Sequence, residues 1–138
     1  MTDGYDHVMP DPLEVLGHIR SNAELILKHF GPVSGVPDFG YNGPSVKWVE
    51  GYIEAQRVRT DLPPESRARL IDVIGSFLGQ AIVHTYGGDW ANDGSEWAIA
   101  FDDRNAAFPF VKVQKQFDNG IEDSIYAFFT AIPGVFKR

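Results

Sequence analysis

The sequence contains no cysteine, which excludes disulfide bonds, thiolate catalysis and cysteine-ligated zinc. A small domain that is stable without disulfides is typical of the cytoplasm, and we predict a cytoplasmic protein. The first residues are acidic where a secretory signal is basic, so we expect no signal peptide. The longest apolar stretch, residues 73–83, is too short to cross a bilayer as a helix, so we expect no membrane contact.

Basic residues are scarce: 12 Lys and Arg against 19 Asp and Glu give a net charge of −7. A chain this acidic is repelled by nucleic acid and by anionic membranes, so we expect neither as a partner. The partner that this charge favours is a basic protein. A length of 138 residues fits a single domain over residues 1–138, in which we expect residues 1–10 to be a flexible tail.

Apolar residues at helical spacing predict three helices in the N-terminal part of the chain. The first begins at Asp11, whose side chain can cap it, and ends at residues 31–32, a Gly-Pro pair. The second covers residues 45–59. The third begins at two consecutive prolines and ends at a Gly-Gly pair, over residues 63–87.

Two glycines, Gly75 and Gly79, lie four residues apart on one side of the third predicted helix. Each costs about 1 kcal/mol relative to alanine inside a helix. We therefore predict that another backbone or an aromatic ring approaches the helix closely at these positions.

After the third helix the apolar period changes from 3.6 to 2, which indicates strands. The Asp-Gly pair at 93–94 predicts a hairpin turn before a strand at 97–101. A longer strand is predicted at 106–117, with a bulge at Pro109 and an edge position in the sheet. A last helix over residues 121–132 completes an α+β fold: three N-terminal helices packed on a small antiparallel sheet, with a C-terminal helix.

Known catalytic motifs are missing: the sequence has no G-x-S-x-G, no P-loop and no dinucleotide fingerprint. Residues 89–100 depart from a calcium-binding loop, because Ala91 and Ala100 replace the required oxygen ligands. We therefore predict no catalytic residues, no metal site and no cofactor, and we favour a non-enzymatic protein. Lys112 and Lys115 are expected on the solvated face of the edge strand.

The feature most suggestive of a binding surface is electrostatic: residues 89–103 hold five acids, no base and two tryptophans. An acidic hairpin with aromatic anchors suits a partner that carries a basic patch. Equally, both tryptophans could belong to the core, with the acids only keeping the hairpin solvated. The predicted partner-binding residues are Asp89, Trp90, Asp93, Glu96, Trp97, Asp102 and Asp103.

Residues 70–130 carry short motifs in a fixed order: Ile74-Gly75-x-x-Leu78-Gly79-x-Ala81-Ile82, Gly87-Gly88-Asp89-Trp90, Phe108-Pro109-Phe110-Val111-Lys112-Val113-x-Lys115 and Asn119-Gly120. This order resembles a family of small bacterial domains of unknown function, with a helix, a tryptophan turn, a proline-containing strand and a final helix. The resemblance implies an α+β fold, supplies no catalytic residues and leaves out residues 1–60. By analogy of size and charge, small acidic bacterial proteins of this kind are often immunity proteins.

The leading hypothesis is a protein-binding domain, in its particular form an immunity protein whose acidic hairpin covers the cationic cleft of a toxin. The alternative is a small-molecule-binding domain or an unrecognised hydrolase. Its pocket would be lined by the Gly- and Pro-rich loop 31–45, with Phe39, Tyr41 and Trp48. A homo-oligomeric structural domain is the third hypothesis, and the sequence does not specify the oligomeric state.

Overall fold

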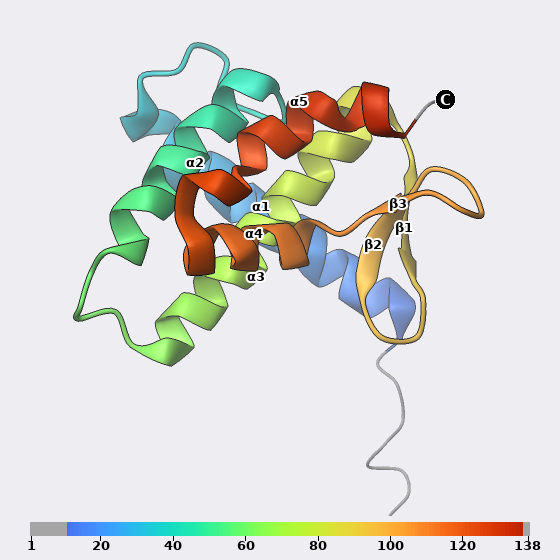
Figure 1. Ribbon diagram of the computed structural model, residues 1–138, viewed down its shortest axis with the longest axis horizontal. Helices are drawn as coiled ribbons and strands as arrows, with labels where there is room; N and C mark the ends of the chain where they lie inside the picture. The colour runs from blue at the N-terminus through green and yellow to red at the C-terminus, as the bar shows by residue number, and fades with distance from the viewer. Residues whose placement is uncertain (1–10, 137–138) are drawn as a thin grey trace, which may run out of the picture.

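The computed structural model describes residues 11–136, and the predicted tail at 1–10 lies outside the described residues. The described chain forms five α-helices and a small three-stranded antiparallel sheet (Figure 1). Three of the helices precede the sheet and two follow it. The predicted α+β class is therefore confirmed, with one more helix after the sheet than expected.

The three N-terminal helices are α1 (Pro12–Ser34), α2 (Gly43–Arg57) and α3 (Pro64–Tyr86). Their beginnings follow the sequence closely. Asp11 caps α1, because its Oδ1 accepts a hydrogen bond from the backbone N–H of Leu13 at 2.9 Å. A proline at the first or second position of each helix costs no hydrogen bond, since those N–H groups have no partner in a helix.

The end of α1 lies further along the chain than predicted. The helix continues through Gly31 and Pro32 and stops only at Gly35, which adopts the left-handed conformation with φ 73°. Pro32 lies in the last turn, where its missing N–H removes a single hydrogen bond. The left-handed glycine, rather than the Gly-Pro pair, ends the helix.

The sheet has the order β1-β2-β3, with β1 (Asp89–Asn92), β2 (Trp97–Ala100) and β3 (Ala106–Ala107). Both pairs are antiparallel. In the β1–β2 hairpin, Asn92 faces Trp97 beside the turn. The predicted hairpin turn and the predicted strand after it are confirmed, although that strand is one residue shorter.

The long strand predicted at 106–117 is wrong. Only β3 is extended, and α4 (Pro109–Asn119) follows it almost at once. Pro109 is the first residue of the helix, a position that needs no N–H donor, and forms no bulge. The buried residues fall at helical spacing, i, i+4, i+7 and i+8: they are Pro109, Val113, Gln116 and Phe117.

This correction also moves Lys112 and Lys115, which lie on a helix and not on a solvated strand edge. Beyond α4, the chain makes a 3₁₀ turn, η2 (Gly120–Asp123), before α5 (Ile125–Val135). The last helix therefore begins later than predicted. It also includes Pro133 within its final turn, where the lost donor again costs little.

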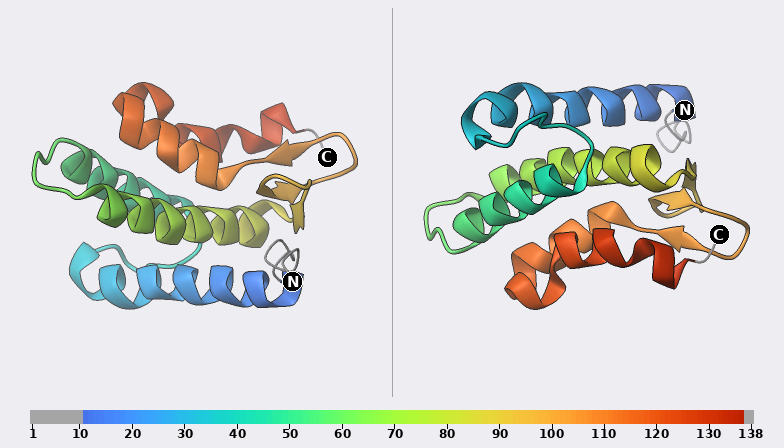
Figure 2. Two further views of the ribbon diagram at one scale, coloured as in Figure 1. Left: turned by 90° about the horizontal axis from the view of Figure 1, so that it is seen from below. Right: turned by 90° about the horizontal axis from the view of Figure 1, so that it is seen from above.

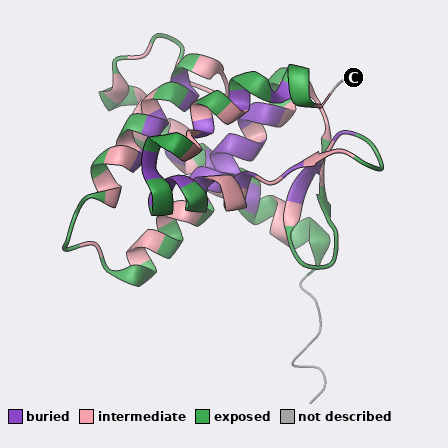
Figure 3. Cartoon of the chain, in the orientation of Figure 1, coloured by how far each residue is buried: buried purple, intermediate pink, exposed green. Residues whose placement is uncertain are grey.

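The helices stack in three layers, with the sheet at one end (Figure 2). One layer is α1, the middle layer is α2 with α3, and the third is α4 with α5. The central helix is α3, which packs against both α1 and α4. Its residues 73–79 are all buried, and most of the core surrounds them (Figure 3).

Membrane insertion has no suitable element in this part of the chain. Within residues 11–136, no helix combines the length and the apolar character that crossing a bilayer requires.

Candidate functional site

The β1–β2 turn is held by the carboxylate of Asp93. Its Oδ1 accepts hydrogen bonds from Ser95 N at 2.9 Å, from Ser95 Oγ at 2.9 Å and from Glu96 N at 3.0 Å. The backbone N–H groups of Glu96 and Ser95, and then the Ser95 hydroxyl, lower the pKa of Asp93. Gly94 provides the positive φ of 103° that the turn requires. Asp93 thus shapes the tip of the hairpin as well as charging it.

The carboxylate of Asp102 holds the loop between β2 and β3 in a similar way. Its Oδ1 accepts hydrogen bonds from the backbone N–H groups of Arg104 and Asn105, both at 2.8 Å. The Asn105 side chain donates to the same carboxylate. This carboxylate therefore has a structural role that is independent of any partner.

All five predicted acids are exposed, but they form two groups. Asp93 and Glu96 lie at the tip of the hairpin. Asp89 faces Ala100 at the opposite end of the β1–β2 ladder, where the loop with Asp102 begins. Asp103 lies on that loop too. The length of β1, about 10 Å at about 3.3 Å per residue, separates the two groups.

The two tryptophans are half-buried and have different surroundings. Trp90 attaches the hairpin to the helices: its Nε1–H donates to Gln80 Oε1 at 2.8 Å, and its ring centroid is 5.8 Å from that of Phe110. Trp97 faces Asn92 across the ladder, next to the turn. Both rings line a hollow in the surface, and Trp90 belongs partly to the core as well.

That hollow, which we call the tryptophan groove, lies between the hairpin and the first turns of α1 and has a volume of about 730 Å³. None of the residues that line it is charged, and most are apolar. Sequence patterns did not predict the α1 residues that complete the groove, because their contact with the hairpin joins segments about 80 positions apart. The lining residues are Pro12, Val15, Leu16, Trp90, Ala91, Asn92, Gly94 and Trp97.

A smaller hollow of about 340 Å³ continues along α1 and carries serine, histidine and acidic side chains. Ser76 Oγ donates to the carbonyl oxygen of Asp72 at 2.8 Å, and Ser95 Oγ donates to the carboxylate of Asp93. Both hydroxyls are therefore held by acceptors other than His18, and this geometry does not support a serine hydrolase. The lining residues are Val15, His18, Ile19, Asn22, Asp72, Ser76, Ser95, Glu96, Trp97 and Phe110.

The loop predicted at 31–45 is shorter in the structure, because α1 continues to Ser34 and α2 begins at Gly43. The loop that remains, residues 35–42, packs its aromatic side chains inward. The ring of Phe39 stacks on Phe77 with centroids 6.1 Å apart and meets Trp48 edge-on at 6.1 Å. Tyr41 lies 5.9 Å from Phe77, and burial followed by the charge of Glu24 raises the pKa of its hydroxyl. These aromatic side chains therefore attach the loop to the body of the protein. They line neither of the two hollows described above.

Metal ligands do not gather in the described part of the chain. From residue 11 to residue 136, no three His, Asp or Glu side chains lie together in a way that could hold a metal ion.

Comparisons with protein-family models, with curated proteins and with solved structures found no match for this chain. The resemblance of residues 70–130 to a small bacterial family stays a hypothesis. The resemblance implies a proline-containing strand, and in this structure that segment is the helix α4.

Proposed function

We propose that this chain is a non-enzymatic domain that binds a basic protein, and that the tryptophan groove and the acids beside it form the docking surface. The observation that carries the proposal is the groove itself: a hollow of about 730 Å³ lined by two half-buried indoles and apolar residues of α1. Buried aromatic anchors supply most of the binding energy at many protein interfaces.

The first turn of α1 also exposes an apolar side chain outside the groove lining. Leu13 follows directly after Pro12 of the groove lining, and 77% of its surface is exposed. An aliphatic or aromatic side chain of a partner that covers these residues would remove apolar area from water at about 25 cal/mol per Å². This favours a partner segment with an apolar face.

Carboxylates beside the groove determine the charge of that partner. Asp11 caps α1 next to Pro12 of the groove lining, and it is exposed. Asp89, Asp93 and Glu96 lie on the hairpin that forms the other wall, and they are exposed too. A partner whose apolar face is flanked by Lys or Arg complements this arrangement. The net charge of −7 also accelerates its approach.

As the particular form of this function we propose an immunity protein that neutralises a basic toxin. A toxin that acts on nucleic acid has a cationic cleft, and an acidic surface with aromatic anchors can compete for that cleft. The support for this finer proposal is the charge and the groove, together with the analogy of size and charge to small acidic bacterial proteins.

The test begins with capture of partners by the wild-type protein from the organism that encodes it, followed by purification of the captured protein. Calorimetry then measures the affinity of the captured protein for the wild type and for three variants, at low and at high salt. Trp97→Ala removes an anchor, and Asp89→Lys with Glu96→Lys reverses charge at two acids whose carboxylates accept no hydrogen bond within residues 11–136. Glu24→Lys with Glu122→Lys is the matched control, since it changes the net charge equally at other exposed sites.

We expect Trp97→Ala to weaken binding about tenfold or more at every salt concentration. The hairpin double variant should weaken binding most at low salt, because screening removes its effect at high salt. The control should bind within about threefold of the wild type. Equal affinity for all four proteins would contradict the proposal. So would light scattering that shows a dimer of the wild type and a monomer of Trp97→Ala, because the groove would then be covered by a second copy of the chain.

A further inference from the structure

A second hollow, between the hairpin and α4, differs in character from the tryptophan groove. We infer that it binds short peptides with free ends: the C-terminal carboxylate at Lys115, the N-terminal ammonium at Glu96, and an apolar C-terminal side chain between them. Its volume is about 480 Å³, within the range of small-ligand sites. We call it the two-charge pocket, and it is lined by Asp93, Glu96, Ala106, Ala107, Phe108, Val111, Lys112, Lys115 and Phe128.

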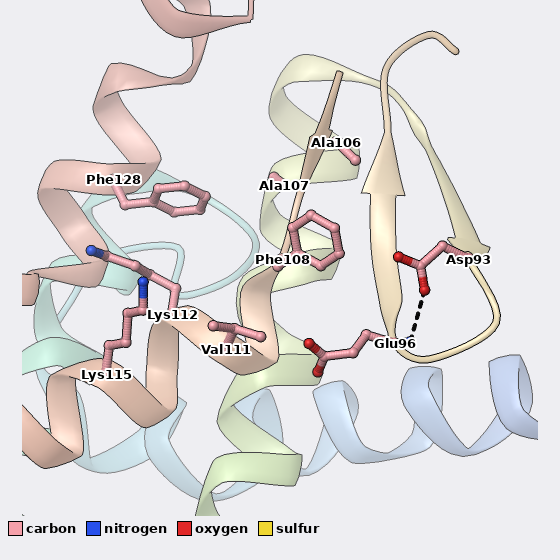
Figure 4. Close-up of a pocket in the computed structure, with 9 residues that line it drawn as sticks. All are labelled: Asp93, Glu96, Ala106, Ala107, Phe108, Val111, Lys112, Lys115 and Phe128. Atoms are coloured by element: carbon pink, nitrogen blue, oxygen red, sulfur yellow. Dashed lines mark hydrogen bonds between the residues drawn. The ribbon is translucent and has the colours of Figure 1, made fainter. Parts of the chain in front are cut away.

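Opposite charges lie on opposite sides of this pocket (Figure 4). Asp93 and Glu96 come from the hairpin, and the two lysines come from α4. Apolar side chains lie between the two charged walls. An anion would be attracted by one wall and repelled by the other, and the same holds for a cation. A ligand that carries both charges, held apart, satisfies both walls.

The lysine wall has one nitrogen that is already paired and one that is not. Lys112 Nζ lies 3.2 Å from Asp123 Oδ1 and 5.8 Å from the centroid of the Phe128 ring. Lys115, three residues further on the same side of the helix, is exposed. Its charge acts on Asp123 at longer range, but it makes no ion pair or hydrogen bond with the described residues. A ligand carboxylate would therefore pair with Lys115, while Lys112 adds a partly neutralised charge.

The acidic wall likewise has one carboxylate that is held by hydrogen bonds and one that is not. Asp93 is held by the hydrogen bonds from Ser95 and from Glu96, one of which is drawn in Figure 4. The carboxylate of Glu96 is exposed and accepts no hydrogen bond from the residues that the structure describes. Its side chain can therefore turn toward a ligand ammonium while Asp93 keeps the local potential negative.

The size of the pocket decides the length of the ligand. A volume of about 480 Å³ has room for a peptide of two or three residues, whose charged ends lie about 7–10 Å apart at about 3.5 Å per residue. The two charges of a free amino acid are too close together to reach both walls. Phe108, Val111 and Phe128 are half-buried and offer an apolar surface to the ligand side chain.

The pocket shares no lining residue with the tryptophan groove, although Glu96 takes part in both proposals; Lys115→Gln and Trp97→Ala are the variants that separate the two sites. The probe is the tripeptide Ala-Ala-Phe, compared with its C-terminal amide and with its N-acetyl form. Amide chemical shifts of the ¹⁵N-labelled protein report both the affinity and the location of binding. The variants are Lys115→Gln and Glu96→Gln, with Lys28→Gln on α1 as the matched control, and Trp97→Ala as the test of independence.

We expect saturable shifts at Phe108, Val111, Lys115 and Phe128. Amidation or acetylation of the tripeptide should weaken binding about fivefold or more. Lys115→Gln should weaken binding of the free acid but not of the amide, and Glu96→Gln should weaken binding of the free amine but not of the acetylated form. Lys28→Gln and Trp97→Ala should bind as the wild type does. Equal binding of all three peptides, shifts outside this pocket, or no saturation would overturn the inference.

Discussion

The indole of Trp90 occupies the space that a side chain on Gly79 would need. A Cβ at position 79 would lie 2.1 Å from Cη2 and 2.2 Å from Cζ2 of that ring. Gly75, one turn earlier on α3, has the same relation to the ring of Phe110, with a Cβ at 2.3 Å. The predicted close approach at both glycines is therefore confirmed, and in each case it is an aromatic ring that approaches.

Gly79→Ala should destabilise the protein even though alanine favours a helix. The new methyl group must displace Trp90, which breaks its hydrogen bond to Gln80 and loosens the hairpin. We expect the free energy of unfolding to fall by about 1–3 kcal/mol. Urea unfolding and the emission maximum of tryptophan fluorescence measure the two effects.

The control for this substitution is Gly51→Ala in α2, where a Cβ would meet no atom within 4 Å. There the helix propensity acts alone, so the free energy of unfolding should rise by about 0.5–1 kcal/mol. If both substitutions stabilise the protein to the same degree, the ring of Trp90 does not press on α3 as described.

A buried carboxylate on α2 holds the beginning of α5. Oε1 of Glu50, which is 9% exposed, accepts hydrogen bonds from the hydroxyl of Ser124 and from the N–H of Tyr126, the latter at 3.2 Å. Glu50→Ala leaves both donors without this acceptor, and we expect a loss of about 1–3 kcal/mol. Hydrogen exchange at Tyr126 should accelerate. Glu50→Gln keeps a carbonyl acceptor at the same place and should lose less, so equal losses for the two variants would contradict this role.

The sequence predicted the helices well where their ends depend on local chemistry. Asp11 as a cap, the prolines that open α3 and the glycines that end it act within one turn of chain. The strand predicted at residues 106–117 was wrong because the apolar side chains of this segment fit a period of 2 as well as a period of 3.6. The decisive residue, Gln116, is polar in sequence but fully buried, where it accepts from Ile125 N and donates to Glu54.

The candidate site was predictable only in part. The acids and tryptophans of the hairpin are neighbours in sequence, and the turn signal at 93–94 placed them on a hairpin. The wall that α1 adds to the tryptophan groove depends on how α1 packs along α3, which no local pattern encodes. The two-charge pocket was hidden for another reason, since it exists only because Lys112 and Lys115 lie on a helix.

The hairpin tip should loosen in acid, because the folded state lowers the pKa of Asp93. A group whose pKa is lower in the folded than in the unfolded protein stabilises the fold above its unfolded pKa. That contribution is lost as the pH falls through the folded value. The stabilising contribution of Asp93 is therefore fully present at neutral pH, and it disappears only at pH values below the ordinary pKa range of an aspartate. A ¹³C-detected titration of the Asp93 carboxylate measures the midpoint.

Ser95→Ala separates the causes of that shift. It removes the donor of the side-chain hydrogen bond but keeps both backbone N–H donors, which have the larger effects. The midpoint of Asp93 should move up toward its ordinary value without reaching it. A midpoint in the wild type at or above the ordinary value would show that these hydrogen bonds do not favour the ionised form.

Phe39→Ala tests the role of the loop after α1. Phe39 is half-buried between Phe77 and Trp48, so its removal should lower the free energy of unfolding by about 2 kcal/mol, less than for a fully buried phenylalanine. Proteolytic cleavage of the loop should accelerate as its attachment is lost. Val33→Ala, at a position that is 71% exposed, is the control and should change stability by no more than about 0.5 kcal/mol. If Phe39 instead lined a ligand pocket, its removal would leave stability unchanged and abolish binding of a small molecule, which would favour the alternative function.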